Sequence, residues 1–161
     1  MEHWKAFDKL SCLKPNFDLG VVIEVGAGPW TQFKGFLNIR PDLTAKEFVV
    51  WEPSADRYMK EVSSCSYKTG YSLKKWDGSG DHPFPVRVVS SGGEKLIEPK
   101  PFDTLISINV IEHVQNVFEY LTGLYVNLKP GGLLIFHDRY YKNATITGGN
   151  VTYVKFILDK Q

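Results

Sequence analysis

Val21-Val22-Ile23-Glu24-Val25-Gly26-Ala27-Gly28 is the stretch that decides the fold. Four of its first five residues are β-branched and apolar, which suits a strand buried on both faces, as parallel sheets require. The two glycines that follow let the backbone turn tightly and approach a ligand closely. Pro29 fits the first turn of a helix, where its missing N–H is not needed. The stretch therefore predicts a strand, a glycine turn and a helix, the usual place for a nucleotide-like cofactor in an open α/β sheet.

The composition is typical of one globular domain, and we expect a single domain over residues 1–161. The chain is 43% hydrophobic and 23% charged, and its formal net charge is +1. A charge so close to zero gives no overall field that would attract nucleic acid or a membrane surface. No stretch approaches the roughly 20 apolar residues that a membrane span needs, and the N-terminal residues do not resemble a signal peptide. We therefore expect neither a nucleic-acid nor a membrane partner.

The chain has two cysteines, Cys12 and Cys65. Two cysteines at this spacing form neither a metal-ligand cluster nor a disulfide framework. They favour a reducing, cytoplasmic location.

Hydrophobic runs and breakers alternate along the chain. Further strands are expected at 47–52, 86–89, 102–110 and 133–137, and helices at 3–13, 31–36, 54–63 and 114–128. Strands that alternate with helices predict a parallel sheet with right-handed crossovers. The last residues predict a hairpin at a sheet edge, formed by 145–147 and 151–158 around a Gly-Gly-Asn turn.

The clearest helical pattern lies at 114–128. Its apolar residues fall three and four apart, and we expect all of them to form one core-facing stripe: Val114, Val117, Phe118, Leu121, Leu124, Tyr125 and Leu128. Residues 64–85 are rich in Gly, Ser, charge and aromatics, and loops this long are usually functional. We expect this loop and the N-terminal helix to cover a substrate.

Three blocks together resemble class I S-adenosylmethionine-dependent methyltransferases. They are Glu24-Val25-Gly26-Ala27-Gly28; Phe102-Asp103 through Glu112-His113-Val114; and Leu128-Lys129-Pro130-Gly131-Gly132-Leu133-Leu134-Ile135. They occur in the family's order and resemble the branch of small-molecule type whose fourth strand leads into a Glu-His-Val helix. The resemblance implies a three-layer α/β/α, Rossmann-like fold with a mostly parallel sheet. It also implies S-adenosylmethionine as cofactor and methyl transfer to an unidentified, small-molecule acceptor.

The resemblance also assigns roles to residues of this chain. Glu24 would hold the methionine end of the cofactor, directly or through the loop, and that end would pass close to Gly26, Ala27 and Gly28. Glu52 would accept hydrogen bonds from both ribose hydroxyls, because a carboxylate matches a vicinal diol.

Three more cofactor contacts follow from the resemblance. Gly93 and Glu94 would lie beside the adenine, and Asn109 would lie under the methionine and the sulfonium. Gly93 and Glu94 follow the third predicted strand, and Asn109 lies at the end of the fourth.

A general base is needed only if the acceptor must lose a proton, and the candidates are His113, His137 and Asp138. Each of them has an alternative structural role, in helix packing or loop hydrogen bonding. A metal site formed by these three residues and Glu112 is conceivable, but the spacing is not diagnostic and we predict no metal.

Two features depart from the family pattern. Trp30 stands where a third small residue is usual, and its indole would crowd the helix start or form part of the pocket wall. The C-terminal part is too short for the family's usual seven strands, so we expect a shortened sheet that ends in an antiparallel strand or hairpin.

Two other functions compete with methyl transfer. An inactive, cofactor-binding relative that serves as an interaction module is compatible with Trp30 and the short C-terminal part. A nicotinamide-dependent oxidoreductase is disfavoured, because the turn has Thr31 where the dinucleotide pattern has its third glycine.

Overall fold

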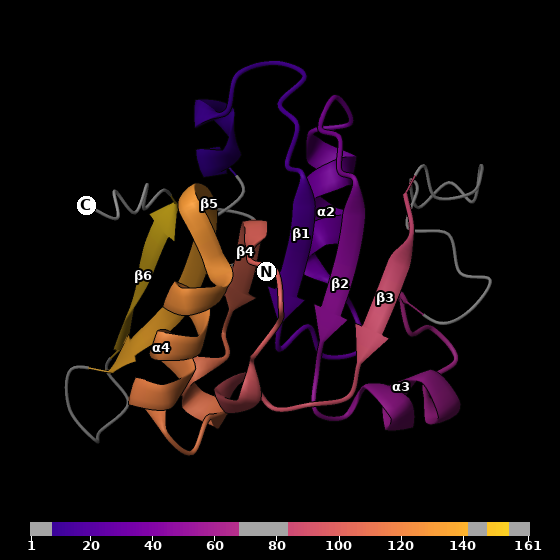
Figure 1. Ribbon diagram of the computed structural model, residues 1–161, viewed down its shortest axis with the longest axis vertical. Coiled ribbons are helices and arrows are strands. Elements are labelled where there is room, and N and C mark those ends of the chain that lie inside the picture. The colour runs from indigo at the N-terminus through magenta and orange to yellow at the C-terminus, as the bar shows by residue number, and fades with distance from the viewer. Residues whose placement is uncertain (1–7, 68–83, 142–147, 155–161) are drawn as a thin grey trace.

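Figure 1 shows the computed structural model, which describes residues 8–67, 84–141 and 148–154. The strands are β1 (Val21–Val25), β2 (Glu47–Trp51), β3 (Val86–Val89), β4 (Phe102–Ile108), β5 (Leu128–Tyr141) and β6 (Gly148–Val154). The helices are α2 (Gln32–Ile39), α3 (Ala55–Glu61) and α4 (Val117–Asn127), with short 3-10 turns η1 (Asp8–Cys12), η2 (Gly93–Lys95) and η3 (Ile111–His113). Within these ranges, no helix combines the length and apolarity needed to cross a membrane.

The described strands form one sheet in the order β3-β2-β1-β4-β5-β6. The strands β1 to β5 run parallel, and β6 pairs antiparallel with β5. The order reverses between β1 and β4, so the carboxyl ends of these two strands flank a topological switch point. The predicted mostly parallel sheet with an antiparallel edge strand is confirmed.

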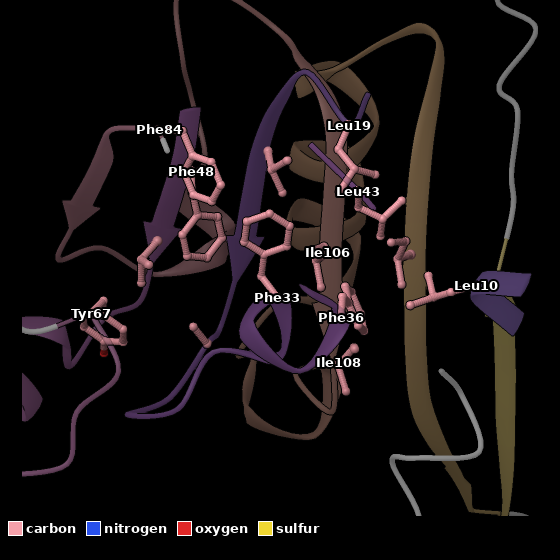
Figure 2. Close-up of a cluster of buried hydrophobic side chains, with 14 of the residues drawn as sticks. Leu10, Leu19, Phe33, Phe36, Leu43, Phe48, Tyr67, Phe84, Ile106 and Ile108 are labelled. Atoms are coloured by element: carbon pink, nitrogen blue, oxygen red, sulfur yellow. The ribbon is translucent and has the colours of Figure 1, made fainter. Parts of the chain in front are cut away.

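Helices cover both faces of the sheet, which gives the predicted three layers. On one face, Phe33 and Phe36 of α2 pack with Phe48 of β2, and the rings of Phe33 and Phe48 lie 4.6 Å apart between centroids (Figure 2). On the opposite face, Tyr120 and Leu124 of α4 pack against β1 and β4. Figure 1 shows α2 and α4 on opposite sides of the strands. The α/β/α architecture is confirmed.

The predicted C-terminal hairpin is wrong. Residues 148–150 belong to β6 and are not a turn, because β6 pairs with β5 through Tyr141↔Gly148 to Ile135↔Val154. Residues 145–147 and 155–158 lie outside the described residues. The pairing covers the hydrogen-bonding edge of β5, which would otherwise be exposed. Of the predicted helix 3–13, the described part forms only η1.

The α4 helix is shorter than predicted and begins after Asn116. The Oδ1 atom of Asn116 accepts hydrogen bonds from the amides of Phe118 and Glu119, and this cap fixes the first turn. Sequence periodicity alone extends the helix to residue 114, because it does not include this cap.

The prediction that the apolar stripe of 114–128 is wholly core is also wrong. Its exposed members include four residues of α4, with Phe118 80% exposed: Val117, Phe118, Leu121 and Tyr125. The buried face instead contains Tyr120, Gly123, Leu124 and Asn127.

Two close contacts explain why this face of α4, and not the apolar stripe, is buried. A Cβ added to Gly123 would lie 3.3 Å from the carbonyl oxygen of Gly93, so the helix approaches η2 closely through its glycine. The side-chain amide of Asn127 donates to the carbonyl of Leu96 at 2.8 Å and accepts from the amide of Glu98 at 3.0 Å. Because a glycine and an asparagine make the close contacts, an apolar pattern does not reveal this face.

Candidate functional site

A cavity of about 440 Å³ opens at the carboxyl ends of β1, β2 and β4. Its lining includes seven of the eight residues predicted to bind the cofactor: Gly26, Ala27, Gly28, Glu52, Gly93, Glu94 and Asn109. The eighth, Glu24, is not among the lining residues. The family resemblance therefore pointed to a set of residues that the fold brings together around one hollow.

The turn after β1 requires its two glycines for different reasons. Both have a left-handed backbone, with φ of +73° at Gly26 and +58° at Gly28. A Cβ at Gly26 would lie 2.6 Å from a methyl group of Val110, so this glycine allows close packing inside the protein. A Cβ at Gly28 would meet nothing within 4 Å. Gly28 therefore faces open space beside the cavity, where a ligand can approach the backbone.

The side chain of Glu24 binds the first turn of α2 and does not line the cavity. Its side chain is buried, and its two carboxylate oxygens accept from the amides of Gln32 at 2.8 Å and Phe33 at 3.1 Å. These amides belong to the first turn of the helix, where backbone N–H groups have no partner within the helix. Burial, with a smaller contribution from the charge of Glu52, raises the pKa of Glu24 to about 8, although the two backbone hydrogen bonds act in the opposite direction. Glu24 thus contacts the loop and the helix that surround the cavity.

Glu52 follows β2 and joins two loops at the cavity. Its Oε2 atom accepts from the amide of Gly28 at 3.0 Å, and its Oε1 atom accepts from the amide of Ser54 at 2.9 Å. Each carboxylate oxygen has two lone pairs, so each keeps the capacity to accept one more hydrogen bond. A pair of adjacent hydroxyl groups would match that remaining capacity.

Two lining residues, Gly93 and Glu94, begin η2 after β3. A Cβ at Gly93 would lie 2.5 Å from the ring of Tyr120, so no larger residue fits there without a shift of the ring. The carboxylate of Glu94 accepts from the amide of Gln115 at 2.7 Å, and backbone hydrogen bonds lower its pKa.

Asn109 follows β4 and has a left-handed backbone, φ +55°. Its backbone amide donates to the backbone carbonyl of His137 at 2.8 Å, which ties the end of β4 to β5. Asn and Asp tolerate this conformation better than other side chains. The residue therefore turns the chain from the strand toward η3.

The three candidate bases lie in different environments. His113 lines the cavity, and its side chain is 75% exposed. His137 and Asp138 are buried and are not among the lining residues. The Oδ2 atom of Asp138 accepts from the amides of Val110 at 3.0 Å and Ile111 at 2.8 Å. Asp138 therefore fixes the start of η3, while His113 alone of the three reaches the hollow.

The remaining charged groups of the site are consistent with an organic ligand. Across the described ranges, no group of three or more His, Cys, Asp or Glu residues could hold a metal ion. The described lining contains the carboxylates of Glu52 and Glu94 and the imidazole of His113, but no Lys or Arg. The cavity therefore favours a neutral or cationic ligand over a phosphate.

The expectation that Trp30 forms part of the pocket wall is wrong. The indole is 53% exposed and is not among the residues that line the cavity. Its Nε1 atom donates to the Oγ atom of Ser64 at 3.2 Å. Segment 64–67 lies against the turn, and its contact with the indole keeps Trp30 outside the cavity lining.

Sequence reasoning missed three polar residues of the lining, Gln32, Ser54 and Tyr58. Gln32 is the first residue of α2, and Tyr58 lies in α3. The position of Gln32 directly after the glycine turn was a usable signal. Nothing in the local sequence distinguishes Tyr58 from an ordinary helix residue.

No protein-family model matches the chain. A ubiquinone biosynthesis O-methyltransferase of Rickettsia bellii is 40% identical over 50 residues, which are 31% of this chain and 21% of that protein. The match is therefore partial, because it covers only about a fifth of the relative's length.

Solved structures with similar folds cover most of the chain. An S-adenosylmethionine-dependent methyltransferase from Clostridium acetobutylicum matches with a TM-score of 0.56 and 18% identity, over 86% of this chain and 50% of that chain. The N-methyltransferase NodS from Bradyrhizobium japonicum matches with a TM-score of 0.57 and 15% identity, over 86% and 67%. The chain therefore has the fold of class I methyltransferases, and it spans about half the length of the Clostridium enzyme.

Proposed function

We propose that the protein binds S-adenosylmethionine in the cavity and transfers its methyl group to a small-molecule acceptor. The observation that carries this proposal is the meeting of the glycine turn and Glu52 at one hollow, through the hydrogen bond from Gly28 to Glu52. This arrangement supports a nucleoside whose ribose hydroxyls lie at the carboxylate. The fold shared with S-adenosylmethionine-dependent enzymes supports the same cofactor.

Two features favour an adenosyl sulfonium over a nicotinamide dinucleotide. In dinucleotide-binding folds, the N-terminal amides of the helix after the glycine turn bind the pyrophosphate. Here the amides of Gln32 and Phe33 already donate to Glu24. The lining carboxylates also disfavour phosphates and favour a sulfonium, because opposite charges attract more strongly in a partly dry site.

Methyl transfer from a sulfonium is an in-line displacement with a good leaving group. The acceptor's lone pair forms a bond to the methyl carbon while the carbon–sulfur bond breaks and its electrons remain on sulfur. The protein mainly has to align the two reactants and exclude water, which in ideal cases supplies up to about 7–11 kcal/mol. If the acceptor must lose a proton, we propose that His113 accepts it, with His137 and Asp138 acting through the loops that they support.

An inactive cofactor-binding module is the second candidate function. It is favoured by the position of Asp138, whose carboxylate is engaged by η3 rather than directed to the cavity lining. Such a protein would bind the cofactor and show no turnover with any acceptor.

The partial relative is named as an O-methyltransferase. Hydroxyl-bearing small molecules are therefore the first acceptors to screen.

Calorimetric titration with S-adenosylmethionine, S-adenosylhomocysteine and NAD tests the cofactor. We expect both adenosyl ligands to bind and NAD not to bind. In thermal unfolding, a ligand at 100 times its Kd should add about 2.7 kcal/mol to the free energy of unfolding. Stabilisation by NAD alone would overturn the proposal, and cofactor binding without methyl transfer across the screen would favour the inactive module.

The same proposal extends to organisation and location. We infer one methyltransferase-like domain over residues 1–161. We also infer a cytoplasmic location, which rests on the two cysteines and on no other feature.

A further inference from the structure

Segment 64–67 lies against the glycine turn from the outside. None of its residues lines the cavity, yet it makes several hydrogen bonds to residues 28–31. The amide of Ser66 donates to the carbonyl of Pro29 at 2.9 Å, and the Oγ atom of Ser66 accepts from the amide of Thr31 at 2.8 Å. Ser66 is fully buried, so water does not compete for these contacts.

Tyr67 makes the contact closest to the cavity. Its hydroxyl donates to the carbonyl oxygen of Gly28 at 2.7 Å, and its side chain is only 5% exposed. Figure 2 shows Tyr67 at one end of the buried cluster that also contains Phe48 and Phe33. Burial raises the pKa of the Tyr67 phenol, so the hydroxyl keeps its proton and remains a donor.

Both polar groups of Gly28 are therefore held by side chains. Its amide donates to Glu52 and its carbonyl accepts from Tyr67. Gly28 has a left-handed backbone, which is one of several conformations that a glycine adopts readily. Two fixed partners on opposite ends of one residue define the path of the turn.

We propose that Ser66 and Tyr67 are positioning residues for the cofactor, which hold the turn 28–31 in its binding shape without touching the ligand. This inference rests on the proposed function, because it assumes that the cavity binds S-adenosylmethionine. A turn already in its bound conformation loses less entropy when the ligand arrives. Loosening the turn should therefore weaken binding even though every lining side chain is intact.

Tyr67→Phe removes the hydroxyl and keeps the ring, and Thr104→Val is its matched control. The hydroxyl of Thr104 is also buried and also donates to a backbone carbonyl, that of Leu19 at 2.8 Å, but Thr104 does not line the cavity. In calorimetric titrations with S-adenosylmethionine, we expect a Kd about three- to tenfold higher for Tyr67→Phe than for wild type. We expect Thr104→Val to bind with the wild-type Kd. Ser66→Ala provides a second test and should also raise the Kd.

Amide hydrogen exchange without ligand gives a readout that a general loss of stability would not produce. The amides of Gly28 and Thr31 should exchange faster in Tyr67→Phe, while the amides of β4 keep the protection that the overall stability of the variant allows. Thr104→Val should leave the turn protected.

Equal Kd values for wild type, Tyr67→Phe and Ser66→Ala would overturn the inference, and so would equal losses in Tyr67→Phe and Thr104→Val. If the wild-type protein does not bind S-adenosylmethionine, the proposed function fails instead. In that case hydrogen exchange still tests the contact. Unchanged exchange at Gly28 and Thr31 in Tyr67→Phe would show that segment 64–67 does not hold the turn.

Discussion

The carboxylate of Glu52 accepts a hydrogen bond from the amide of Gly28 at 3.0 Å, which ties the end of β2 to the turn after β1. Its second oxygen accepts from the amide of Ser54, so one side chain fixes the loops on both sides of the cavity. The residue proposed to bind the ribose therefore also supports the walls of its own site. Binding and stability should both depend on it.

We predict that Glu52→Ala weakens S-adenosylmethionine binding by about 1.5–3 kcal/mol, the range of hydrogen bonds to a charged group. The variant should also lose about 1–3 kcal/mol of unfolding free energy, because two backbone amides lose their acceptor. Calorimetric titration and urea unfolding measure the two effects.

Glu47→Ala is the control for Glu52→Ala. Glu47 begins the same strand and pairs with Arg87 at 3.3 Å, and such partly exposed pairs contribute about 0–1 kcal/mol. Its loss should leave the cofactor affinity unchanged. If a folded Glu52→Ala variant binds as tightly as Glu47→Ala, then Glu52 is not part of the site.

A second prediction compares Gly28 with Gly131, a glycine of similar backbone conformation that serves as its control. Both have positive φ, +58° and +71°, and a Cβ at either position would meet nothing within 4 Å. Substitution by Ala should cost each variant about 1–2 kcal/mol of unfolding free energy, because a Cβ strains the left-handed conformation. Only Gly28→Ala should also raise the Kd for S-adenosylmethionine, since only Gly28 lines the cavity. Equal Kd values in the two variants would show that the ligand does not approach Gly28.

The parts of the fold that sequence predicted are those set by local pattern. The run of β-branched residues before Gly26 gave β1 and its turn, and the position of Glu52 after an apolar run gave the end of β2. Parallel strands bring their carboxyl ends to one edge, so these residues meet once the strands are identified.

The contacts that sequence could not predict join distant parts of the chain. Tyr67 reaches the carbonyl of Gly28 across 39 positions, and Ser64 contacts the indole of Trp30 across 34. Tyrosine, serine and tryptophan occur in loops for many reasons, so no local pattern marks these pairs. The orientation of α4 likewise depends on the close approach of Gly123 to η2, which an apolar periodicity does not contain.

The orientation of α4 leads to a third prediction. Phe118 is 80% exposed and Leu124 only 4%, although both belong to the apolar stripe of the sequence. Phe118→Ala should change the unfolding free energy by no more than about 0.5 kcal/mol, whereas Leu124→Ala should cost about 2–5 kcal/mol. Urea unfolding of the two variants measures the difference. A larger loss for Phe118→Ala would mean that the stripe, and not the face containing Tyr120, packs on the sheet.

The fourth prediction follows from the buried carboxyl of Glu24. Its pKa is about 8 in the folded protein, where burial disfavours the charged form, and 4.5 is its ordinary value. Between these two pH values the folded protein retains a proton that the unfolded chain releases. The contribution of Glu24 to stability should therefore fall as pH rises from about 4.5 to about 8, and then level off.

Glu24→Gln isolates this effect because the amide does not titrate. The variant should be less stable overall. Its NH₂ group would face one of the two backbone amides that donate hydrogen bonds to the carboxyl oxygens of Glu24. Its deficit relative to wild type should shrink as pH rises through the same window, in urea unfolding at a series of pH values. Parallel curves for the two proteins would mean that Glu24 ionises at its ordinary pKa. The backbone amides of α2 would then offset the cost of burying its charge.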